Sequence, residues 1–354
     1  MGGSNAKRTH LRRIIMRSAV FHAAGEPLVI ETRPDPAPGP DEVVMKVHSC
    51  GICGTDLHMT EGHSPGFDYP AGTVPGHEYA GEVVAVGAEV QGLQIGDRIS
   101  ALPFTGCGHC LACQRGSPSH CAAFRGLGSG FSEYVAVSER TSIKLPDSLT
   151  YDDGALLEPM AVGLHGAAMA GITPGATVLV LGAGPIGLAA AFFARKLGAG
   201  RVVVAANSTR RQALALQMGA DAFIAQGQGQ TLAAAATEAF GAAPDIVLEC
   251  AGQPGCISQA IQAVSRAGTV VVLGFCTTAD SFVPATAVWK EITLRFSNTY
   301  TVGDFQYVAQ VLARGALEPR AMITQHVSLD EVPSVFEALR TPSGQCKVMI
   351  HPWA

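Results

Sequence analysis

An apolar strand that runs straight into a glycine-rich turn and then a helix is the feature that most limits how this chain folds. Residues 176–181 read Ala-Thr-Val-Leu-Val-Leu, and a helical segment, residues 188–197, follows the turn. Such a continuous apolar run is typical of a parallel sheet covered on both faces. In this context, glycines spaced G-x-G-x-x-G allow a tight turn, close approach of a pyrophosphate and close packing of the helix. We therefore predict a dinucleotide-binding turn made of Gly182, Gly184, Pro185, Ile186 and Gly187.

The alternation of strands and helices continues beyond this turn. Further apolar strands are expected at residues 201–205, 222–225, 245–249, 269–273 and 292–296. This alternation favours an α/β fold with a doubly wound parallel sheet of the Rossmann type. We assign this domain to residues 158–301. Because 354 residues are too many for one small core, a second domain is expected.

The rest of the chain reads as a mostly-β, barrel-like domain. Short strands cut by glycine and proline are expected at residues 41–48, 83–86, 131–137 and 347–351. Because chain ends often lie close together, the segment after residue 301 is expected to return to the first domain. We assign residues 16–157 and 302–354 to this domain, and residues 1–15 to a disordered tail.

Composition and charge exclude several classes of function. The first 15 residues are basic but lack the apolar segment of a secretory signal, so we expect a cytoplasmic protein. No apolar run approaches the ~18 residues of a membrane span, so no membrane partner is expected. The net charge of −5 lacks the strong positive character that favours nucleic-acid binding. Without an export signal, the ten cysteines favour metal binding over disulfides.

Four of these cysteines form a regular motif. Their spacing is C-x₂-C-x₂-C-x₇-C, and they are Cys107, Cys110, Cys113 and Cys121. Four thiolates at this spacing predict a closed, tetrahedral zinc site with no open position. The surrounding lobe, residues 105–122, is too poor in apolar residues to order itself, so the metal is expected to order it.

A second group of metal-competent residues lies nearer the N-terminus. Cys53, Thr55 and His58 fall within nine residues, and His77 is followed directly by Glu78. A thiolate and an imidazole suit Zn²⁺, and a hydroxyl just after a metal-binding cysteine is placed to take a proton from a bound alcohol. Taken alone, the first stretch is equally compatible with a tight polar turn between two strands.

Glu158 has two interpretations. We expect a helix over residues 155–165 with Pro159 in its first turn. A glutamate at the head of that helix interacts favourably with the helix dipole. It is equally a candidate for the third protein ligand of the first zinc, and the spacing does not separate the two.

From about Met16 to its end, the chain resembles the zinc-containing medium-chain alcohol dehydrogenases. The resemblance rests on the glycine turn, the four-cysteine lobe, residues 51–56 (Gly-Ile-Cys-Gly-Thr-Asp) and residues 76–81 (Gly-His-Glu-Tyr-Ala-Gly) with Gly87. Leu-Glu-Pro at 157–159 is similar to the sorbitol and threonine dehydrogenase branch. The family resemblance implies a GroES-like catalytic domain beside the Rossmann-type domain. It also implies hydride transfer between a small alcohol, or its aldehyde or ketone, and a nicotinamide cofactor.

The same resemblance implies roles for the second group. Cys53, His77 and Glu158 would hold a catalytic zinc, with Glu78 as an alternative ligand. Thr55 would take the hydroxyl proton of the substrate and pass it toward His58 and solvent. Asp56 would fix the ring of His77 from behind. The chain would then carry one catalytic and one structural zinc.

The sequence also departs from that branch. Sorbitol dehydrogenases have a tyrosine and an arginine that contact the polyol where this chain has Met59 and Thr299. A less polar alcohol or ketone is therefore favoured, with a polyol or threonine-type substrate as the alternative. A quinone or enone reductase is disfavoured by Cys53 and His77. A non-catalytic, zinc-stabilised relative of the fold is disfavoured by the pair Thr55 and His58.

The cofactor is expected to be NADP(H), with NAD(H) possible. NAD sites of this fold carry an acidic residue about 20 residues past the glycines. Here that position, at the end of the second strand, is Ala206, and no acid occurs between Gly187 and Asp221. The residues that follow can donate hydrogen bonds to a 2′-phosphate; they are Ser208, Thr209, Arg210 and Arg211.

A homodimer or homotetramer is also expected. The strand at residues 292–296 comes late in the nucleotide-binding domain, where it could form the edge of the sheet. An exposed edge strand favours pairing with its symmetry mate. The family resemblance points the same way.

Overall fold

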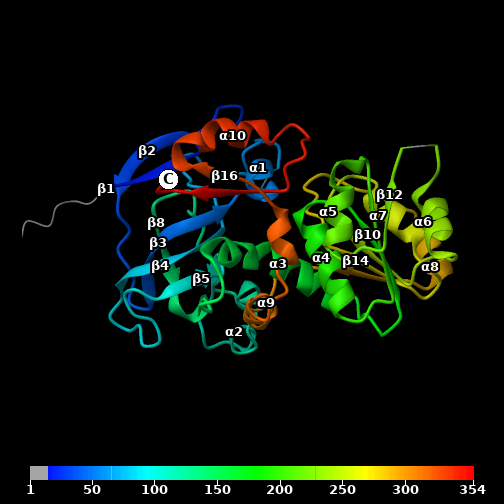
Figure 1. The fold of residues 1–354 in the computed structure, drawn as a ribbon, viewed down its shortest axis with the longest axis horizontal. Helices are drawn as coiled ribbons and strands as arrows, with labels where there is room; N and C mark the ends of the chain where they lie inside the picture. The colour runs from blue at the N-terminus through cyan, green and yellow to red at the C-terminus, as the bar shows by residue number, and fades with distance from the viewer. Residues whose placement is uncertain (1–14, 65, 228) are drawn as a thin grey trace, which may run out of the picture.

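The computed structural model describes residues 15–64, 66–227 and 229–354. Two sheets, each with its own helices, lie side by side and are joined by the long helix α3 (Tyr151–Met169) (Figure 1). The left-hand part of Figure 1 contains both the first and the last strands, and the right-hand part contains the middle of the chain. The tail expected at residues 1–15 lies outside the described residues except for Ile15, which is the first residue of a strand.

The right-hand part is built on a parallel sheet, as expected for a doubly wound domain. Its strands are β10 (Thr177–Leu181), β11 (Arg201–Ala206), β12 (Ala222–Ala225), β13 (Ile246–Glu249), β14 (Thr269–Val272) and β15 (Thr293–Phe296). Their order is β12-β11-β10-β13-β14-β15, and every neighbouring pair is parallel. The order reverses between β10 and β13, where sheets of this kind bind their ligand. The predicted fold class is confirmed.

The helices on the two faces of this sheet explain why its strands are apolar throughout. Val178 and Val180 of β10 pack in one core with α3 and α4 (Pro185–Lys196). Leu179 and Leu181 pack in another core with α6 (Leu232–Phe240) and α7 (Cys256–Ala263). Alternate side chains of a strand point to opposite faces, so both sets must be apolar.

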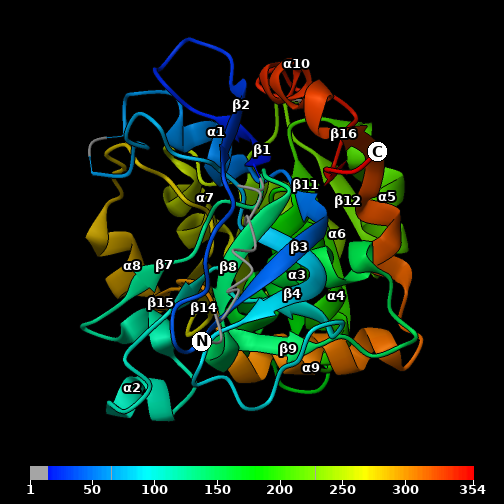
Figure 2. The same cartoon turned by 90° about the vertical axis from the view of Figure 1, so that its left-hand side faces the viewer.

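The left-hand part is built on a mostly antiparallel sheet. Its strands run β16-β17-β3-β4-β5-β9, and β8 also pairs with β3. The strands of this part are β1 (Ile15–Val20), β2 (Val29–Pro34), β3 (Glu42–Gly51), β4 (Glu78–Val86), β5 (Arg98–Ala101), β6 (Phe104–Thr105), β7 (Arg125–Gly126), β8 (Tyr134–Ser138), β9 (Ser142–Lys144), β16 (Ile323–Ser328) and β17 (Lys347–His351). Strand β17 is antiparallel to β3, and Ile350 faces Cys50. The last strand therefore pairs with the strand that leads into Cys53, and the C-terminus lies near β16 (Figure 2).

Helix α3 starts earlier than the sequence analysis expected. Thr150 caps it by accepting from the backbone N–H of Asp153, whose carboxylate accepts from the Thr150 backbone in return. Pro159 therefore lies inside the helix, not in its first turn, and Glu158 is not at its head. The interpretation of Glu158 as a partner of the helix dipole is wrong. The overlooked signal is the capping pattern Thr-x-x-Asp.

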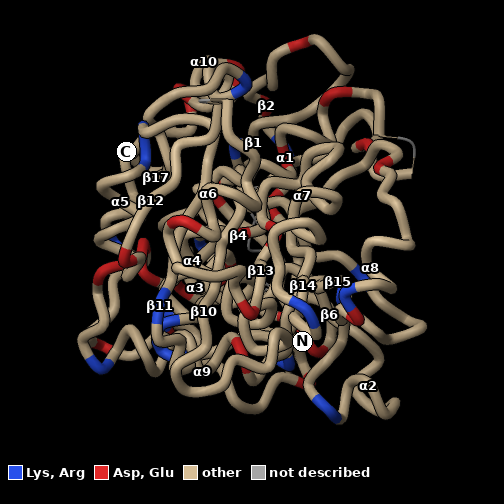
Figure 3. The backbone as a smooth tube through the Cα atoms, turned by 90° about the vertical axis from the view of Figure 1, so that its right-hand side faces the viewer, with Lys and Arg blue, Asp and Glu red and all other residues tan. Residues whose placement is uncertain are grey.

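The remaining helices are short. They are α1 (Gly54–Met59), α2 (Leu111–Gln114), α5 (Gln212–Gln217), α8 (Pro284–Lys290), α9 (Val302–Ala313) and α10 (Val332–Ala338). In the part of the chain that the structure describes, no helix has both the length and the apolar character needed to cross a bilayer. Charged residues are sparse and both signs are interspersed along the backbone (Figure 3).

Candidate metal centres and nucleotide cradle

Cys53 is held at the start of helix α1. It is the N-terminal capping residue, and its Sγ accepts from the backbone N–H of Thr55 at 3.5 Å. Its own backbone N–H donates to Oδ2 of Asp56 at 3.3 Å. Because these bonds satisfy amides that the helix leaves unpaired, the local sequence fixes the position of the thiol.

Asp56 orients His77. The carboxylate of Asp56 is fully buried, and its Oδ1 accepts from the Tyr69 hydroxyl at 2.9 Å and from the Gly76 N–H at 3.1 Å. The same oxygen lies 3.2 Å from Nδ1 of His77. Because Nδ1 is engaged, Nε2 is the atom of that ring that can bind a metal. Burial opposes ionisation of both groups, but their mutual attraction raises the pKa of His77 and lowers that of Asp56.

Glu78 is the third potential metal ligand beside Cys53 and His77. One ligand atom from each of these three residues lies within 4.8 Å of the others. Among the described residues, Glu158 is not part of this group. A Cβ on Gly51 would lie 2.0 Å from Oε2 of Glu78, so a glycine there leaves room for the carboxylate. A thiol, an imidazole and a carboxylate are a three-residue donor set of the kind that holds a catalytic zinc.

Sequence analysis missed Lys347, which pairs with Glu78. Its Nζ lies 2.6 Å from both oxygens of Glu78 and donates to the carbonyl of Ile52 at 3.1 Å. Both side chains are buried. Burial opposes the lysine's charge, but the Glu78 carboxylate more than offsets it and raises the pKa of Lys347. A charged residue opening an otherwise apolar last strand was the available signal.

Glu158 lies in a different environment. Burial raises its pKa to about 7, although the positive charge of His77 acts in the opposite direction. Burial, followed by the nearby Glu158, raises the pKa of Tyr300. The Tyr300 hydroxyl has no hydrogen-bond partner among the described residues. The structure thus brings Glu158 near the centre but not into the donor group.

His58, one of the two residues expected to relay the proton, begins a series of contacts that ends at an exposed side chain. Nδ1 of His58 lies 3.3 Å from Oε2 of Glu61, which lies 3.1 Å from Nε2 of the exposed His63. Within the described ranges, no hydrogen bond joins the side chains of Thr55 and His58. Sequence analysis missed Glu61 and His63, which follow the end of α1.

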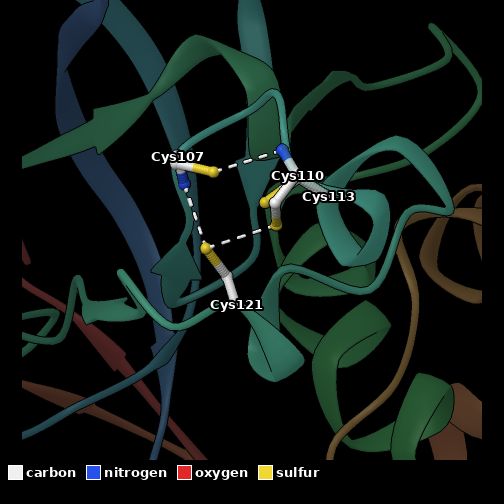
Figure 4. A group of neighbouring side chains, drawn as sticks. All are labelled: Cys107, Cys110, Cys113 and Cys121. Carbon is white, nitrogen blue, oxygen red and sulfur yellow. Dashed lines mark hydrogen bonds between the residues drawn. The ribbon is translucent and has the colours of Figure 1, made fainter.

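The four-cysteine lobe brings its thiols together (Figure 4). One sulfur atom from each of Cys107, Cys110, Cys113 and Cys121 lies within 4.8 Å of the others, and all four cysteines are free. Backbone N–H groups point at them: that of Cys110 at Sγ of Cys107 (3.3 Å), and that of Cys107 at Sγ of Cys121 (3.4 Å).

Backbone N–H groups lower the pKa of Cys107 and Cys121, whereas burial raises the pKa of Cys113 to about 12. The backbone N–H groups of residues 109 and 110 lower the pKa of Cys107 to about 6. A Cβ on Gly106 would lie 2.7 Å from Sγ of Cys113, so only glycine lets the thiols converge. Four convergent thiols with amide donors fit a structural zinc with no place for a substrate.

We expect Cys107→Ser to lower thermal stability by several degrees but to leave turnover of the surviving protein within a few-fold of wild type. The reason is that the lobe is closed to substrate and orders itself through the metal. Cys276→Ser is the control, because that partly buried free thiol lies outside the lobe and forms its hydrogen bonds with Thr278. Normal stability combined with lost activity would contradict the structural role.

The glycine turn is shaped for a nucleotide. Gly182 has φ +108°, which favours glycine, and a Cβ on Gly187 would lie 1.9 Å from the Gly182 carbonyl. A Cβ on Gly184 would meet no atom closer than Nη1 of Arg211, at 4.0 Å. The turn thus leaves open backbone at the start of α4, where Pro185 is the first residue. Open amides at a helix start fit a pyrophosphate.

Arg211 lies beside this turn, and its sequence neighbour Arg210 is held differently. Nη1 of Arg211 donates to the carbonyl of Ala183 at 3.2 Å, and Nη2 donates to the carbonyl of Gln345. Arg210 is exposed, with long contacts of 3.4 Å to Oγ of Ser208 and to the carbonyl of Pro342. Arg211 is therefore fixed at the turn, while Arg210 remains available to a ligand.

Comparison with known proteins agrees with this geometry. Residues 39–147 match the family described as alcohol dehydrogenase GroES-like domain, and residues 185–314 match the zinc-binding dehydrogenase family. Sorbitol dehydrogenase of Bacillus subtilis is 32% identical over 351 residues, which cover 95% of this chain and 97% of the relative.

Solved structures show the same fold. A zinc-binding dehydrogenase of Sinorhizobium meliloti, solved bound to NADP, has a TM-score of 0.86 and 33% identity over 96% of this chain and 100% of its own. The 2R,3R-butanediol dehydrogenase of Bacillus subtilis has a TM-score of 0.84 and 31% identity, covering 95% and 99%. This chain is therefore a zinc-dependent alcohol dehydrogenase of the medium-chain family, in which a GroES-like and a Rossmann-type domain together transfer a hydride between an alcohol and a nicotinamide cofactor.

Proposed function

We propose that this protein is an NADP(H)-preferring dehydrogenase of small, weakly polar secondary alcohols, with one catalytic and one structural zinc per chain. The observation that carries the proposal is the convergence of Cys53, His77 and Glu78 next to the helix that bears Thr55 and His58. Metal analysis of protein freed of loosely bound metal tests the stoichiometry directly: two zinc ions per chain are expected, and one ion with full turnover would contradict it.

Each residue of this centre has a distinct task in the proposed reaction. When bound, zinc supplies a Lewis acid that lowers the pKa of the substrate hydroxyl, and the nicotinamide accepts the hydride. Asp56 keeps Nε2 of His77 directed at the metal position. The Thr55 hydroxyl would accept the substrate proton as it gives up its own; because no direct hydrogen bond joins Thr55 and His58, a bridging water would carry that proton to His58, which contacts Glu61 on the way to solvent.

The surroundings of the centre support a weakly polar substrate. Met59 follows the relay histidine, and Thr299 precedes Tyr300; these are the two positions where sorbitol dehydrogenases carry polyol-contacting residues. Phe67, from the loop after α1, meets Phe275, from the loop after β14, edge to face at 5.2 Å between ring centroids. Both rings are nearly half exposed, so they offer apolar surface where the two domains meet.

A substrate panel read at the nicotinamide absorbance tests this proposal. We expect higher kcat/KM with 2-butanol and 2,3-butanediol than with sorbitol or threonine. The similar dehydrogenase of Bacillus subtilis is named for 2R,3R-butanediol, and this name supports the expected preference. A sorbitol kcat/KM above that of every weakly polar alcohol would overturn the substrate assignment but not the dehydrogenase chemistry.

The NADP preference rests on Ala206 and the arginines beside it. Strand β11 ends at Ala206 without an acid to hold the ribose hydroxyls. Ser208 and the loosely held Arg210 are placed to contact a 2′-phosphate, and Arg211 keeps the turn in shape. The NADP bound to the similar dehydrogenase of Sinorhizobium meliloti supports the same cofactor.

We expect kcat/KM with NADP to exceed that with NAD by about a hundredfold, since one charge-assisted contact is worth roughly 1.5–3 kcal/mol. Ala206→Asp should reverse the preference, because the carboxylate would repel the phosphate and bind the ribose hydroxyls. Arg210→Ala with Arg211→Ala should reduce NADP affinity. Equal or better kinetics of the wild type with NAD would refute the preference.

We also propose a homodimer, or a homotetramer built from such dimers, that associates through β15. This strand is at the sheet edge, as expected from the sequence. Large apolar side chains are exposed on it and on the neighbouring helix α8; they are Val288 (75%), Trp289 (74%) and Phe296 (63%). Pairing of two edges would continue the sheet and cover these side chains.

Light scattering at micromolar concentration should give at least twice the mass of one chain. Val288→Lys should lower the mass toward that of one chain, because a charge would be placed in the covered surface. Ile95→Lys is the matched control, since Ile95 is 63% exposed in a loop far along the chain from α8. A monomeric wild type would refute the assembly.

The proposed location is the cytoplasm. All ten cysteines are free in the structure, including four that lie close enough to share a metal. Free thiols persist in a reducing compartment. Fractionation of cells that express the full chain tests the location.

A further inference from the structure

A third group of potential metal ligands lies apart from both zinc centres. It consists of Asp152 in the first turn of α3, His326 on β16 and His351 at the end of β17. Nε2 of His326 lies 2.9 Å from Oδ2 of Asp152, and Nε2 of His351 lies 2.8 Å from Oδ1. One ligand atom from each residue lies within 4.8 Å of the others. None of these residues belongs to the catalytic or the structural group.

The local fold holds these three side chains in place. Strands β16 and β17 are parallel, and Ser328 faces His351 in the register. Residue 326 lies two positions before 328 and thus on the same face, so the two imidazoles come together with ring centroids 4.8 Å apart. The Ser49 hydroxyl donates to Oδ1 of Asp152 at 2.6 Å and orients the carboxylate.

The donor set matches borderline transition metals. Two imidazoles and one carboxylate are ligands that Zn²⁺ accepts at about 2.0–2.2 Å, which places ligand atoms about 3.4 Å apart in a tetrahedron. Nε2 of each histidine lies 2.8–2.9 Å from a different oxygen of the same carboxylate, and one ligand atom from each of the three residues lies within 4.8 Å of the others, so side-chain adjustment can bring all three to one ion. The side chains of His326 and His351 are 49% and 36% exposed, which gives an ion access and leaves coordination positions for water.

We propose that Asp152, His326 and His351 form a third metal site, which takes a divalent ion such as Zn²⁺ and fastens β16 and β17 to α3. The ion replaces the two N–H···O contacts with three metal–ligand bonds, and Ser49 supports the carboxylate from behind. Helix α3 carries Glu158 and strand β17 carries Lys347, so the site ties together two elements that reach the catalytic centre. Zinc binding is therefore expected to stabilise the fold.

Zinc titration of the full-length holoenzyme, freed of loosely bound metal, tests this site. Wild type should bind one Zn²⁺ per chain more than the double variant His326→Gln with His351→Gln, by calorimetry and metal analysis. Added Zn²⁺ should raise the Tm of wild type by several degrees and leave that of the double variant unchanged. His22→Gln is the matched control, because His22 is also an exposed histidine paired with a carboxylate, Glu31, at 2.6 Å.

Copper provides a test that does not depend on the folding of a variant. One equivalent of Cu²⁺ added to the wild-type holoenzyme should give an electron paramagnetic resonance spectrum with coupling to two imidazole nitrogens. The spectrum should persist in His22→Gln. Equal metal content and equal Zn²⁺-dependent Tm in wild type and double variant, or a copper spectrum without imidazole nitrogens, would overturn the site and leave the cluster a hydrogen-bonded cross-link only.

Discussion

Replacing His77 or Cys53 with alanine is expected to lower kcat/KM by at least about a thousandfold, a loss of about 4 kcal/mol of transition-state stabilisation. Each change removes one of three donor atoms that lie within 4.8 Å of one another. The zinc content should fall by one ion per chain, because two remaining ligands hold the metal weakly. The affinity for NADPH should stay within a few-fold of wild type, because the glycine turn lies in the other domain.

Measuring zinc content, steady-state kinetics and NADPH fluorescence on the same preparations separates these effects. His22→Ala is the control for His77→Ala, since both histidines contact a carboxylate but His22 is exposed and lies on the surface. Retained activity in either His77→Ala or Cys53→Ala would end the assignment of the catalytic metal. Loss of both activity and NADPH binding would indicate a folding defect.

Lys347→Met is expected to reduce the free energy of unfolding by about 3–5 kcal/mol, because it leaves the buried carboxylate of Glu78 without its counter-charge. In the structure, Nζ of Lys347 contacts both oxygens of Glu78 at 2.6 Å, and neither side chain reaches solvent. The unpaired carboxylate should take up a proton and become a poorer metal ligand. Zinc affinity and turnover should therefore fall together.

Denaturant unfolding of the single and double variants separates the effect of losing the buried ion pair from the effect of leaving one charge unpaired. Lys347→Met with Glu78→Gln should recover most of the stability, because no buried charge is left unpaired, but it should not recover turnover. Lys144→Met is the matched control, since Lys144 is half exposed where it meets Asp97 at 2.9 Å, and such a solvent-screened pair should contribute less than about 1 kcal/mol. Equal losses in Lys347→Met and Lys144→Met would show that the buried pair has no special role.

The two metal centres differ in how far local sequence could identify them. The four lobe cysteines span 15 residues, and their spacing alone specified a tetrahedral thiolate site that the folded chain brings together. Cys53 and His77 belong to separate elements, and their motifs identified them only as candidates. The third donor could not be chosen, because Glu78 and Glu158 are 80 residues apart in sequence but share one region of space.

The sequence by itself determined the features that depend on neighbouring residues. Three such features can be recognised without knowing the fold, because each depends only on nearby residues. They are the strand periodicity, the glycine turn from Gly182 to Gly187 and the missing acid at Ala206. Only the tertiary structure decided which distant side chains meet. The antiparallel pairing of β17 with β3 brings Lys347 to Glu78, and the pairing of β17 with β16 brings His351 to His326. The physical reason is that strand register and domain packing set these contacts, and both depend on the whole buried core.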